Sequence, residues 1–367
     1  MNQDQGRAAA ARARRLDELA GRPPRQFDFP DSTSFWSALI NAGDFPDPHD
    51  RDPRLTFSAA VTGAGEHGGT EGGYLASRGV LEAVWHRTLT SGQILSRCTR
   101  IPITESAVSI PAIQETSRAD GSRWGAIKSA WVDAGDTVDD ADTSRPKFRS
   151  INLKPKKLLS FVYATNELTR DAGAFGAWAE LALSDEIRHQ LEQSIVDGDG
   201  AGKPLGIANA DATISIPKES GQAASTILTE NLENMLTRIW SESRRRAVWL
   251  TGTAAFAQIE HTSFSNGRPT VEYVDGEPTI AGRPVLLTEY TPQLGNKGDI
   301  ALVDFSQVVV GERERDIVSS LHLRWLQDEQ VLRARYRVDA QPLWASALTP
   351  KNSAATQSFA VTVDERA

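Results

Sequence analysis

The chain contains a single cysteine, Cys98, and this scarcity excludes an internal disulfide framework and a cysteine-rich metal site. It also lacks any apolar run that approaches the roughly eighteen residues of a membrane-spanning helix. Residues 1–20 contain no apolar stretch of the kind found in secretory signal peptides. Together these absences predict a soluble protein of a reducing cytoplasm.

An excess of basic residues is also missing. The chain has 40 Lys and Arg against 48 Asp and Glu, for a formal net charge of −8, whereas a dedicated duplex-DNA-binding protein is expected to be basic. The six histidines include no pair at a metal-ligand spacing such as i, i+4, and no Gly-x-Ser-x-Gly motif of a nucleophilic serine occurs. The sequence therefore predicts no catalytic residue, no metal site and no cofactor.

The length of 367 residues, of which 40% are hydrophobic and 24% charged, suits two or three sub-regions that share a large core. Apolar residues recur at helical spacing before a stop at Asp197-Gly198, which predicts a helix from about residue 171 to 197 with an apolar stripe of Trp178, Leu181, Ile187, Leu191 and Ile195. Shorter helices are predicted at 78–89, 231–240 and 254–261, and strands at 158–164, 247–250, 270–287, 300–310 and 332–339. Long helices mixed with scattered strands, without βαβ repetition, predict an α+β fold.

The N-terminal segment is poor in core-forming residues. Residues 1–25 are rich in Ala and Arg and predict a marginal helix or a disordered arm, which is either a solvated tail or a contact for a polyanion. Residues 23–73 are broken by prolines and end in a glycine cluster, as in a linker or an extended arm. Because Phe35 and Trp36 are costly to leave in water, we expect this arm to lie on another surface.

Residues 113–149 form a long polar stretch with an unusual charge pattern. Five aspartates occur without a base, and a basic run then follows: Asp133, Asp136, Asp139, Asp140 and Asp142, then Arg145, Lys147, Arg149, Lys154, Lys156 and Lys157. The aspartates lack the spacing of a calcium-binding EF-hand loop. A structureless loop of this length is improbable, so we expect a two-stranded ribbon that rests on a neighbouring copy of the chain. Trp124 and Trp131 stand on this ribbon and are candidate contacts.

Two further motifs allow more than one interpretation. The run from Asp197 to Pro204 resembles a phosphate-binding loop, but Asp197 and Pro204 occupy the positions of the first Gly and the Ser or Thr of that motif. The run also follows a helix and not a strand, so a turn is favoured over a nucleotide site at Gly198 to Lys203. The charged run from Glu312 to Asp316 is either a solvated segment or a rim of interface ion pairs.

The order of these features resembles the major capsid proteins of tailed bacteriophages, which have the Hong Kong 97-type fold. The motifs that carry the resemblance are Gly72-Gly73-Tyr74-Leu75, Val108-Ser109-Ile110-Pro111, Leu153 to Leu158, Thr165 to Asp171, Asp197 to Ile207, Ala281 to Val285, Gly298 to Asp304 and Asp328 to Val338. The run from Asp197 to Ile207 is the most specific of them. The resemblance spans about residues 72–348.

The resemblance implies a division of the chain into the regions of that fold. The expected regions are an N-terminal arm (1–72), the start of the peripheral domain (73–104), an extended β-ribbon loop (105–160), the peripheral spine helix (161–205), the axial domain (206–310) and the peripheral return strands with a C-terminal tail (311–367). The contacts between copies are then expected at Phe35, Trp36, Trp124, Trp131, Asp136, Asp139, Asp140, Asp142 and Lys147.

The resemblance also implies a function. We expect a structural protein, not an enzyme, that assembles with itself as hexamers and pentamers into an icosahedral shell around phage DNA, which it contacts non-specifically. The short N-terminal arm implies either a separate scaffolding protein or scaffolding by the arm itself, and a portal is expected as a further partner. Assembly in the host cytoplasm, a final location in the virion and no membrane contact follow. The alternatives are an encapsulin-like nanocompartment shell and a nucleotide-dependent cytoplasmic enzyme.

Overall fold

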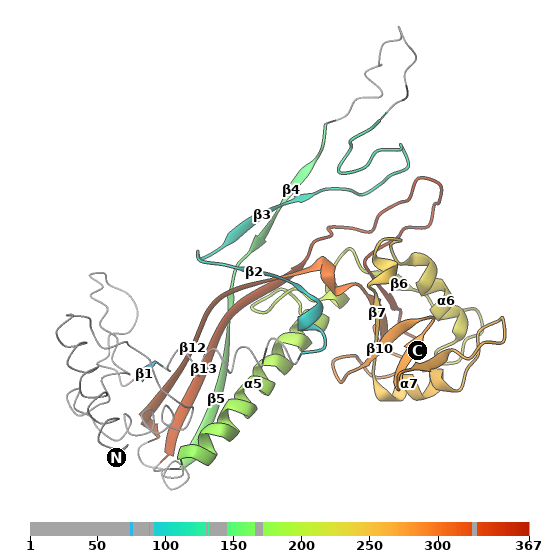
Figure 1. The fold of residues 1–367 in the computed structure, drawn as a ribbon. Coiled ribbons are helices and arrows are strands. Elements are labelled where there is room, and N and C mark those ends of the chain that lie inside the picture. Colours follow the sequence, from blue (N-terminus) through green and yellow to red (C-terminus); the bar gives the residue numbers. More distant parts are fainter. Residues whose placement is uncertain are drawn as a thin grey trace, which may run out of the picture. The chain divides into compact units, whose positions relative to one another are not determined.

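The computed structural model describes residues 74–75, 88, 92–129, 131, 145–165, 172–324 and 329–366 (Figure 1). The chain divides into two compact units, the first with residues Leu158–Ile187 and Glu314–Tyr336 and the second with Ser91–Lys157, Arg188–Arg313 and Arg337–Ala367. The predicted N-terminal arm, residues 1–72, lies outside the described residues, as does the predicted helix 78–89 apart from Thr88.

The longest helix, α5, spans Ala172–Asp197, so the helix predicted to end at Asp197 is confirmed. Six of its buried apolar residues follow an i, i+4 row that forms one ridge along the helix: Phe175, Ala179, Leu183, Ile187, Leu191 and Ile195. The predicted stripe was wrong in its first turns, because Trp178 and Leu181 lie off this ridge and are 54% and 42% exposed. Phe175, Ala179 and Leu183 are therefore buried in place of the predicted Trp178 and Leu181.

Long strands form a five-stranded sheet in the order β1–β12–β13–β5, and β2 pairs with β12. The strands are β1 Tyr74–Leu75, β2 Thr99–Pro102, β5 Lys156–Thr165, β12 Val308–Arg324 and β13 Glu329–Pro342. In β13 the apolar residues Leu332, Ala334, Tyr336 and Val338 are buried and the intervening arginines are partly exposed, so the predicted one-sided strand is confirmed. Asp339 departs from the alternation, since it is fully buried.

The charged run Glu312–Asp316 lies on β12, and it is not a solvated segment. Asp316 is 5% exposed, and Arg335 on β13 donates to its two carboxylate oxygens at 2.9 and 2.8 Å. A bidentate pair of this kind is stronger and more directional than a single exposed ion pair. The run therefore joins two strands of the same chain.

The second unit contains a seven-stranded sheet in the order β6–β14–β11–β7–β10–β9–β8. Its strands are β6 Ile214–Ile216, β7 Val248–Thr251, β8 Val271–Val274, β9 Glu277–Ile280, β10 Arg283–Leu287, β11 Ile300–Val303 and β14 Ala360–Val363. Helices α6 Thr229–Arg238 and α7 Thr253–Glu260 lie beside the sheet (Figure 1), and short 3-10 turns occur at Leu95–Arg97, Ile207–Asn209, Ser243–Arg245 and Phe305–Gln307. The short helices predicted at 231–240 and 254–261 and the strands near 248, 271–287 and 300 are thus confirmed, with shifts of a few residues.

Trp249 lies at the centre of this core. Its side chain is fully buried, and the indole Nε1 donates to the carbonyl of Ile280 at 3.0 Å. Leu232 and Met235 of α6, Phe256 of α7 and strand residues from β6 to β14 surround it in one apolar cluster. Burial of each such aliphatic or aromatic side chain contributes about 1.5–3 kcal/mol.

The last strand corrects the expected domain boundaries. β14 pairs antiparallel with β11 and parallel with β6, so residues 360–363 belong to the sheet of the predicted axial segment 206–310. The prediction that grouped all of 311–367 with the peripheral return strands was wrong at this point. Arg366 completes the attachment, because its buried guanidinium pairs with the buried Asp299 and donates to the carbonyl of Thr226 at 2.6 Å.

Strands β3 Val108–Ile113 and β4 Phe148–Leu153 pair antiparallel from Val108–Leu153 to Ile113–Phe148. Figure 1 shows them as a narrow two-stranded ribbon. Ile151 and Leu153 pack with Ile103 and Val309 in a small apolar cluster at its base. Gly311 lies against this cluster, and a Cβ there would be 2.4 Å from Ile103 Cδ1, so a larger residue would force Ile103 to shift.

Candidate interaction surface

The glycine turn after α5 is closed by its own backbone. Gly198 N–H donates to Ser194 O at 2.9 Å, Gly200 N–H to Pro204 O at 3.2 Å and Gly206 N–H to Gly198 O at 2.8 Å. A Cβ at Gly198 would lie 2.1 Å from Pro204 O, so the close backbone approach requires glycine. Because these amides already donate to carbonyl oxygens of the chain, they cannot donate to a phosphate, as the amides of a phosphate-binding loop must. The geometry therefore supports the turn and not the nucleotide site.

Lys156 binds the backbone carbonyls of the glycine turn. Its ammonium donates to Gly200 O at 3.0 Å, to Lys203 O at 2.6 Å and to Asp339 Oδ1 at 3.2 Å. The buried Asp339 also accepts from the backbone amides of Lys154 at 2.9 Å and Ala340 at 3.0 Å. One lysine thus joins the base of the loop, the glycine turn and β13, and an ammonium with three acceptors has no remaining donor.

The predicted ribbon ends earlier than expected. After Ile113 the described residues 114–129 form turns and isolated bridges instead of a strand, and they fold back onto the segment around Thr349. Arg118 N–H donates to Thr349 O at 2.8 Å, and Thr349 N–H donates to Thr116 O at 3.0 Å. The expectation of a two-stranded ribbon over 113–149 was therefore wrong for these residues, which bond instead to the segment near Thr349 of the same chain. Sequence reasoning could not pair 116–118 with a segment more than 200 residues away.

Three of the candidate contact residues are described, and all three are exposed. Trp131 is 105% exposed, Trp124 is 66% exposed, and the Lys147 side chain is also exposed to solvent. The backbone brings Trp124 and Lys147 together, because Lys147 N–H donates to the carbonyl of Gly125 at 2.8 Å. Ile127 and Phe148 add exposed apolar surface of 52% and 67%, which the sequence analysis missed. Phe35, Trp36, Asp136, Asp139, Asp140 and Asp142 lie outside the described residues.

Trp124 is held in a strained turn. Trp124, Gly125 and Ala126 have φ angles of 53°, 78° and 120°, and positive values are uncommon for residues other than glycine. Arg123 and Ile127 close the turn by two backbone hydrogen bonds of 2.9 and 2.7 Å. Strain of this kind persists where the surrounding structure imposes it, and it is concentrated at functional sites. The turn therefore fixes the direction of an exposed indole.

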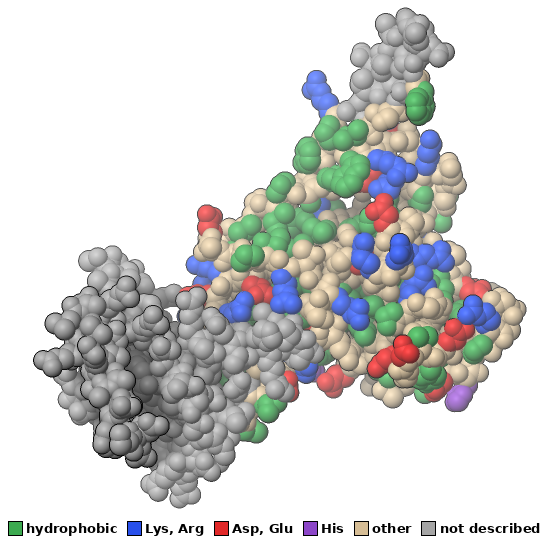
Figure 2. Space-filling model, in the orientation of Figure 1, with side chains coloured by type: hydrophobic (Ala, Val, Ile, Leu, Met, Phe, Trp, Pro, Cys, Tyr) green, Lys and Arg blue, Asp and Glu red, His purple; other side chains and the backbone are tan. Residues whose placement is uncertain are grey.

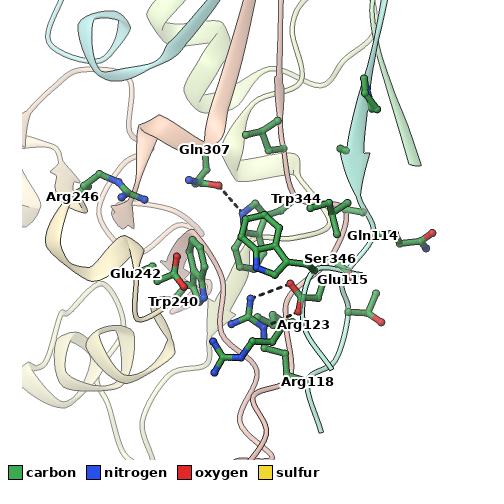
Figure 3. A pocket seen from close by; sticks show the side chains of 18 residues that line it. Gln114, Glu115, Arg118, Arg123, Trp240, Glu242, Arg246, Gln307, Trp344 and Ser346 are labelled. Atoms are coloured by element: carbon green, nitrogen blue, oxygen red, sulfur yellow. Dashed lines mark hydrogen bonds and ion pairs between the residues drawn. The ribbon is translucent and has the colours of Figure 1, made fainter. Parts of the chain in front are cut away.

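A cavity of about 480 Å³ lies between this loop and the segment 343–348. Trp240 and Trp344 stand at its wall with ring centroids 5.1 Å apart in an edge-to-face arrangement, and Trp344 Nε1 donates to Gln307 Oε1 at 3.0 Å (Figure 3). Trp124 also lines it. No local pattern in the sequence marks this group, because Trp124, Trp240 and Trp344 are each more than 100 residues from the next.

Charged side chains line the same cavity. Arg118 makes a bidentate contact with Glu115 at 2.8 and 3.0 Å, and this hydrogen bond raises the pKa of the guanidinium (Figure 3). Arg246 pairs with the buried Asp304 at 3.0 Å. The face in view mixes hydrophobic and basic side chains around the loop (Figure 2). Aromatic walls with arginines at the edge are typical of contact sites in protein interfaces.

Nothing in the described part of the chain points to a metal centre or a membrane span. None of its His, Cys, Asp and Glu side chains gather in a group of three that could hold a metal ion. Within the described ranges, no helix is both long and apolar enough to cross a bilayer.

Comparison with known proteins identifies the family. A family model described as the phage capsid family matches residues 72–352, most of the chain. The chain belongs to the phage capsid family. Its α+β fold is the Hong Kong 97-type fold that the motifs predicted, and this prediction is confirmed.

Individual relatives are distant. The major capsid protein of Escherichia phage T5 is 22% identical over an alignment that covers 62% of this chain and 53% of the relative, so the chain spans about half of that protein. Among solved structures, the capsid of an empty GTA particle has a TM-score of 0.57 and 14% identity, with 90% of this chain and 99% of the other covered. A structure from Mycobacterium phage Cain has a TM-score of 0.50 and 15% identity, with 74% and 90% covered. At these identities the structures show a shared fold.

Proposed function

We propose that the chain is a major capsid protein that assembles with itself into an icosahedral shell enclosing phage DNA. The family match over residues 72–352 carries this proposal, and the exposed apolar loop supports it. Exposed indoles are costly in water and are enriched at protein interfaces, so they indicate that this surface is covered in the functional state. The protein has no catalytic role in this proposal.

The finer parts of the proposal concern partners and location. Hexamers and pentamers of the chain form the shell, a separate scaffolding protein and a portal take part in assembly, and the packaged DNA is contacted non-specifically. Assembly takes place in the host cytoplasm, and the mature protein resides in the virion. The net charge of −8 supports weak contact with DNA, because like charges repel.

Within this proposal the residues of the loop mediate contacts between copies. Trp124, Trp131 and Lys147 are exposed on it, and the acids at 136–142 and the arm residues Phe35 and Trp36 act with them. In this proposal, residues 105–160 act as the extended loop of the capsid fold, and the spine helix and the axial sheet act as they do in that fold.

The proposal is tested by deleting Ala119–Thr143 from the full-length chain. The base of the ribbon remains paired from Val108–Leu153 to Ile113–Phe148, so we expect a folded, soluble chain that no longer forms shells. Light scattering and electron microscopy compare it with the unmodified chain, which we expect as particles in the megadalton range. Normal shells from the deletion would contradict the role of the loop, and an unmodified chain that never assembles would contradict the function.

The contents of the particles test the alternative of a nanocompartment. Small uniform shells that contain protein would favour an encapsulin-like compartment, whereas large shells that hold or admit DNA support the capsid.

A further inference from the structure

Trp131 is the most exposed large apolar side chain among the described residues. Its exposed fraction of 105% means that its own chain covers none of the indole. It follows Trp124 by seven residues on the same loop, yet only Trp124 lines the cavity of about 480 Å³. An indole that its own chain leaves fully exposed suggests that another molecule covers Trp131, because Trp is strongly enriched among energetically dominant interface contacts.

The cavity has the size and chemistry to receive an indole. Its volume lies within the range of binding pockets, and Trp124, Trp240 and Trp344 offer ring faces and edges for aromatic contacts. Ser346 also lines it, and the buried Ser346 Oγ has no hydrogen-bond partner among the described residues. An indole N–H is a donor and needs an acceptor when it is buried, which this hydroxyl can provide.

Charged residues near the cavity indicate how a second copy would be oriented in the contact. A smaller cavity of about 170 Å³ shares Arg118 and Arg123 with the larger one, and Lys351 also lines this basic extension. In the sequence, Trp131 is followed at once by aspartates and by no base until Arg145. An indole in the larger cavity would therefore carry acidic residues toward the basic extension, and such complementarity fixes orientation and partner choice.

We propose that Trp131 of one copy inserts into the cavity bounded by Trp124, Trp240 and Trp344 of a second copy. The inference rests on the proposed shell function and names the site on one copy that binds the loop of another copy. The Trp131 side chain and the cavity are different surfaces of the same chain, so the contact between two copies is head-to-tail. Such a contact propagates from copy to copy and closes into a ring if the rotation between copies allows it.

A disulfide test in the full-length chain distinguishes this contact from others. We pair Trp131→Cys with Ser346→Cys and oxidise the assembled particles mildly. Cys98 does not interfere, since burial raises the pKa of its thiol to about 12. The proposal predicts a ladder of covalent multimers on a non-reducing gel, because each chain carries both halves of the contact. Trp131→Cys alone can join at most two chains.

The matched control replaces the pocket cysteine by one on another exposed turn. Asp275 lies in the tight turn between β8 and β9, and Trp131→Cys paired with Asp275→Cys should give no ladder beyond dimers. Intact particles without a ladder from the Ser346 pair would overturn the inference and leave the shell function standing. A disulfide within one chain would also overturn it, because the loop would then fill its own cavity. Failure of the unmodified chain to assemble would refute the shell function itself.

A second measurement does not depend on disulfide geometry. We expect Trp131→Ala to raise the concentration needed for assembly at least tenfold, as for a dominant interface residue, and Trp131→Phe to recover part of the loss. Thermal unfolding of the unassembled chain should be unchanged in both variants, because the side chain is exposed. Equal assembly of Trp131→Ala and the unmodified chain would overturn the inference.

Discussion

Trp249 and Trp131 are the same residue type in opposite surroundings. Trp249 is fully buried in the seven-stranded-sheet core with its N–H satisfied, and Trp131 is 105% exposed on the loop that follows β3. The first region is complete within one chain, since strands from β6 to β14 share one apolar cluster. The second presents Trp124, Ile127, Trp131 and Phe148 to solvent. The contrast indicates that one region stabilises the fold and the other forms contacts between copies.

The strongest test of this comparison exchanges each tryptophan for alanine. We expect Trp249→Ala to lower the free energy of unfolding by about 3–5 kcal/mol, because it leaves a cavity in a packed core. Trp131→Ala should stay within about 0.5 kcal/mol, as exposed substitutions usually do. Denaturant unfolding of the unassembled chains measures both. A large loss of stability in Trp131→Ala would remove the distinction between the two regions.

A smaller effect is expected where the loop joins the rest of the second unit. Lys156→Ala removes an ammonium that contacts Gly200 O, Lys203 O and the buried Asp339, and hydrogen bonds to charged groups contribute about 1.5–3 kcal/mol. We expect a loss of that size and faster hydrogen exchange in the turn 198–206. The neighbouring exposed Lys157 provides the control, and Lys157→Ala should change neither quantity. Equal effects of the two variants would mean that Lys156 does not anchor the loop.

The last prediction concerns the single cysteine, whose effect on stability is confined to alkaline pH. Burial is the main cause that raises the pKa of the Cys98 thiol to about 12, and the nearby Glu192 adds to it. Because the folded chain keeps a proton that the unfolded chain loses at lower pH, this contribution to stability is full below pH 9 and declines as the pH rises toward about 12. Cys98→Ala should flatten that decline in unfolding experiments.

Labelling of Cys98 at pH 8 gives an independent measurement. Each unit by which the pKa rises lowers the thiolate fraction tenfold, so the folded chain should react roughly a thousandfold more slowly than the chain in denaturant. Rapid labelling of the folded chain would show that Cys98 is accessible to the reagent and that the core around it does not exclude solvent.

The sequence was most informative where local patterns decide the outcome. The end of α5 at Asp197 followed from the Asp-Gly stop, and the alternation in β13 followed from its period of two. Glycine positions also marked the turn 198–206 correctly, because a Cβ at Gly198 would meet backbone oxygen. The family followed from the order of several weak motifs.

Errors arose where distant segments compete for the same surface. The ridge of α5 uses Ala179 and Leu183 in place of Trp178 and Leu181, and β14 joins the sheet of β6 and β11. Neither choice is visible in local spacing, because helical periodicity does not state which face meets a sheet, and a short apolar strand does not state its partner.

Sequence alone thus determined the class of fold, the long helix and the candidate indoles, since these depend on residue type and period. Only the tertiary structure decided that residues 114–129 fold back onto the segment near Thr349, and that Trp124, Trp240 and Trp344 surround one cavity. The physical reason is that such contacts bring together side chains more than 100 residues apart, and their pairing is set by packing and by backbone hydrogen bonds that no local pattern encodes.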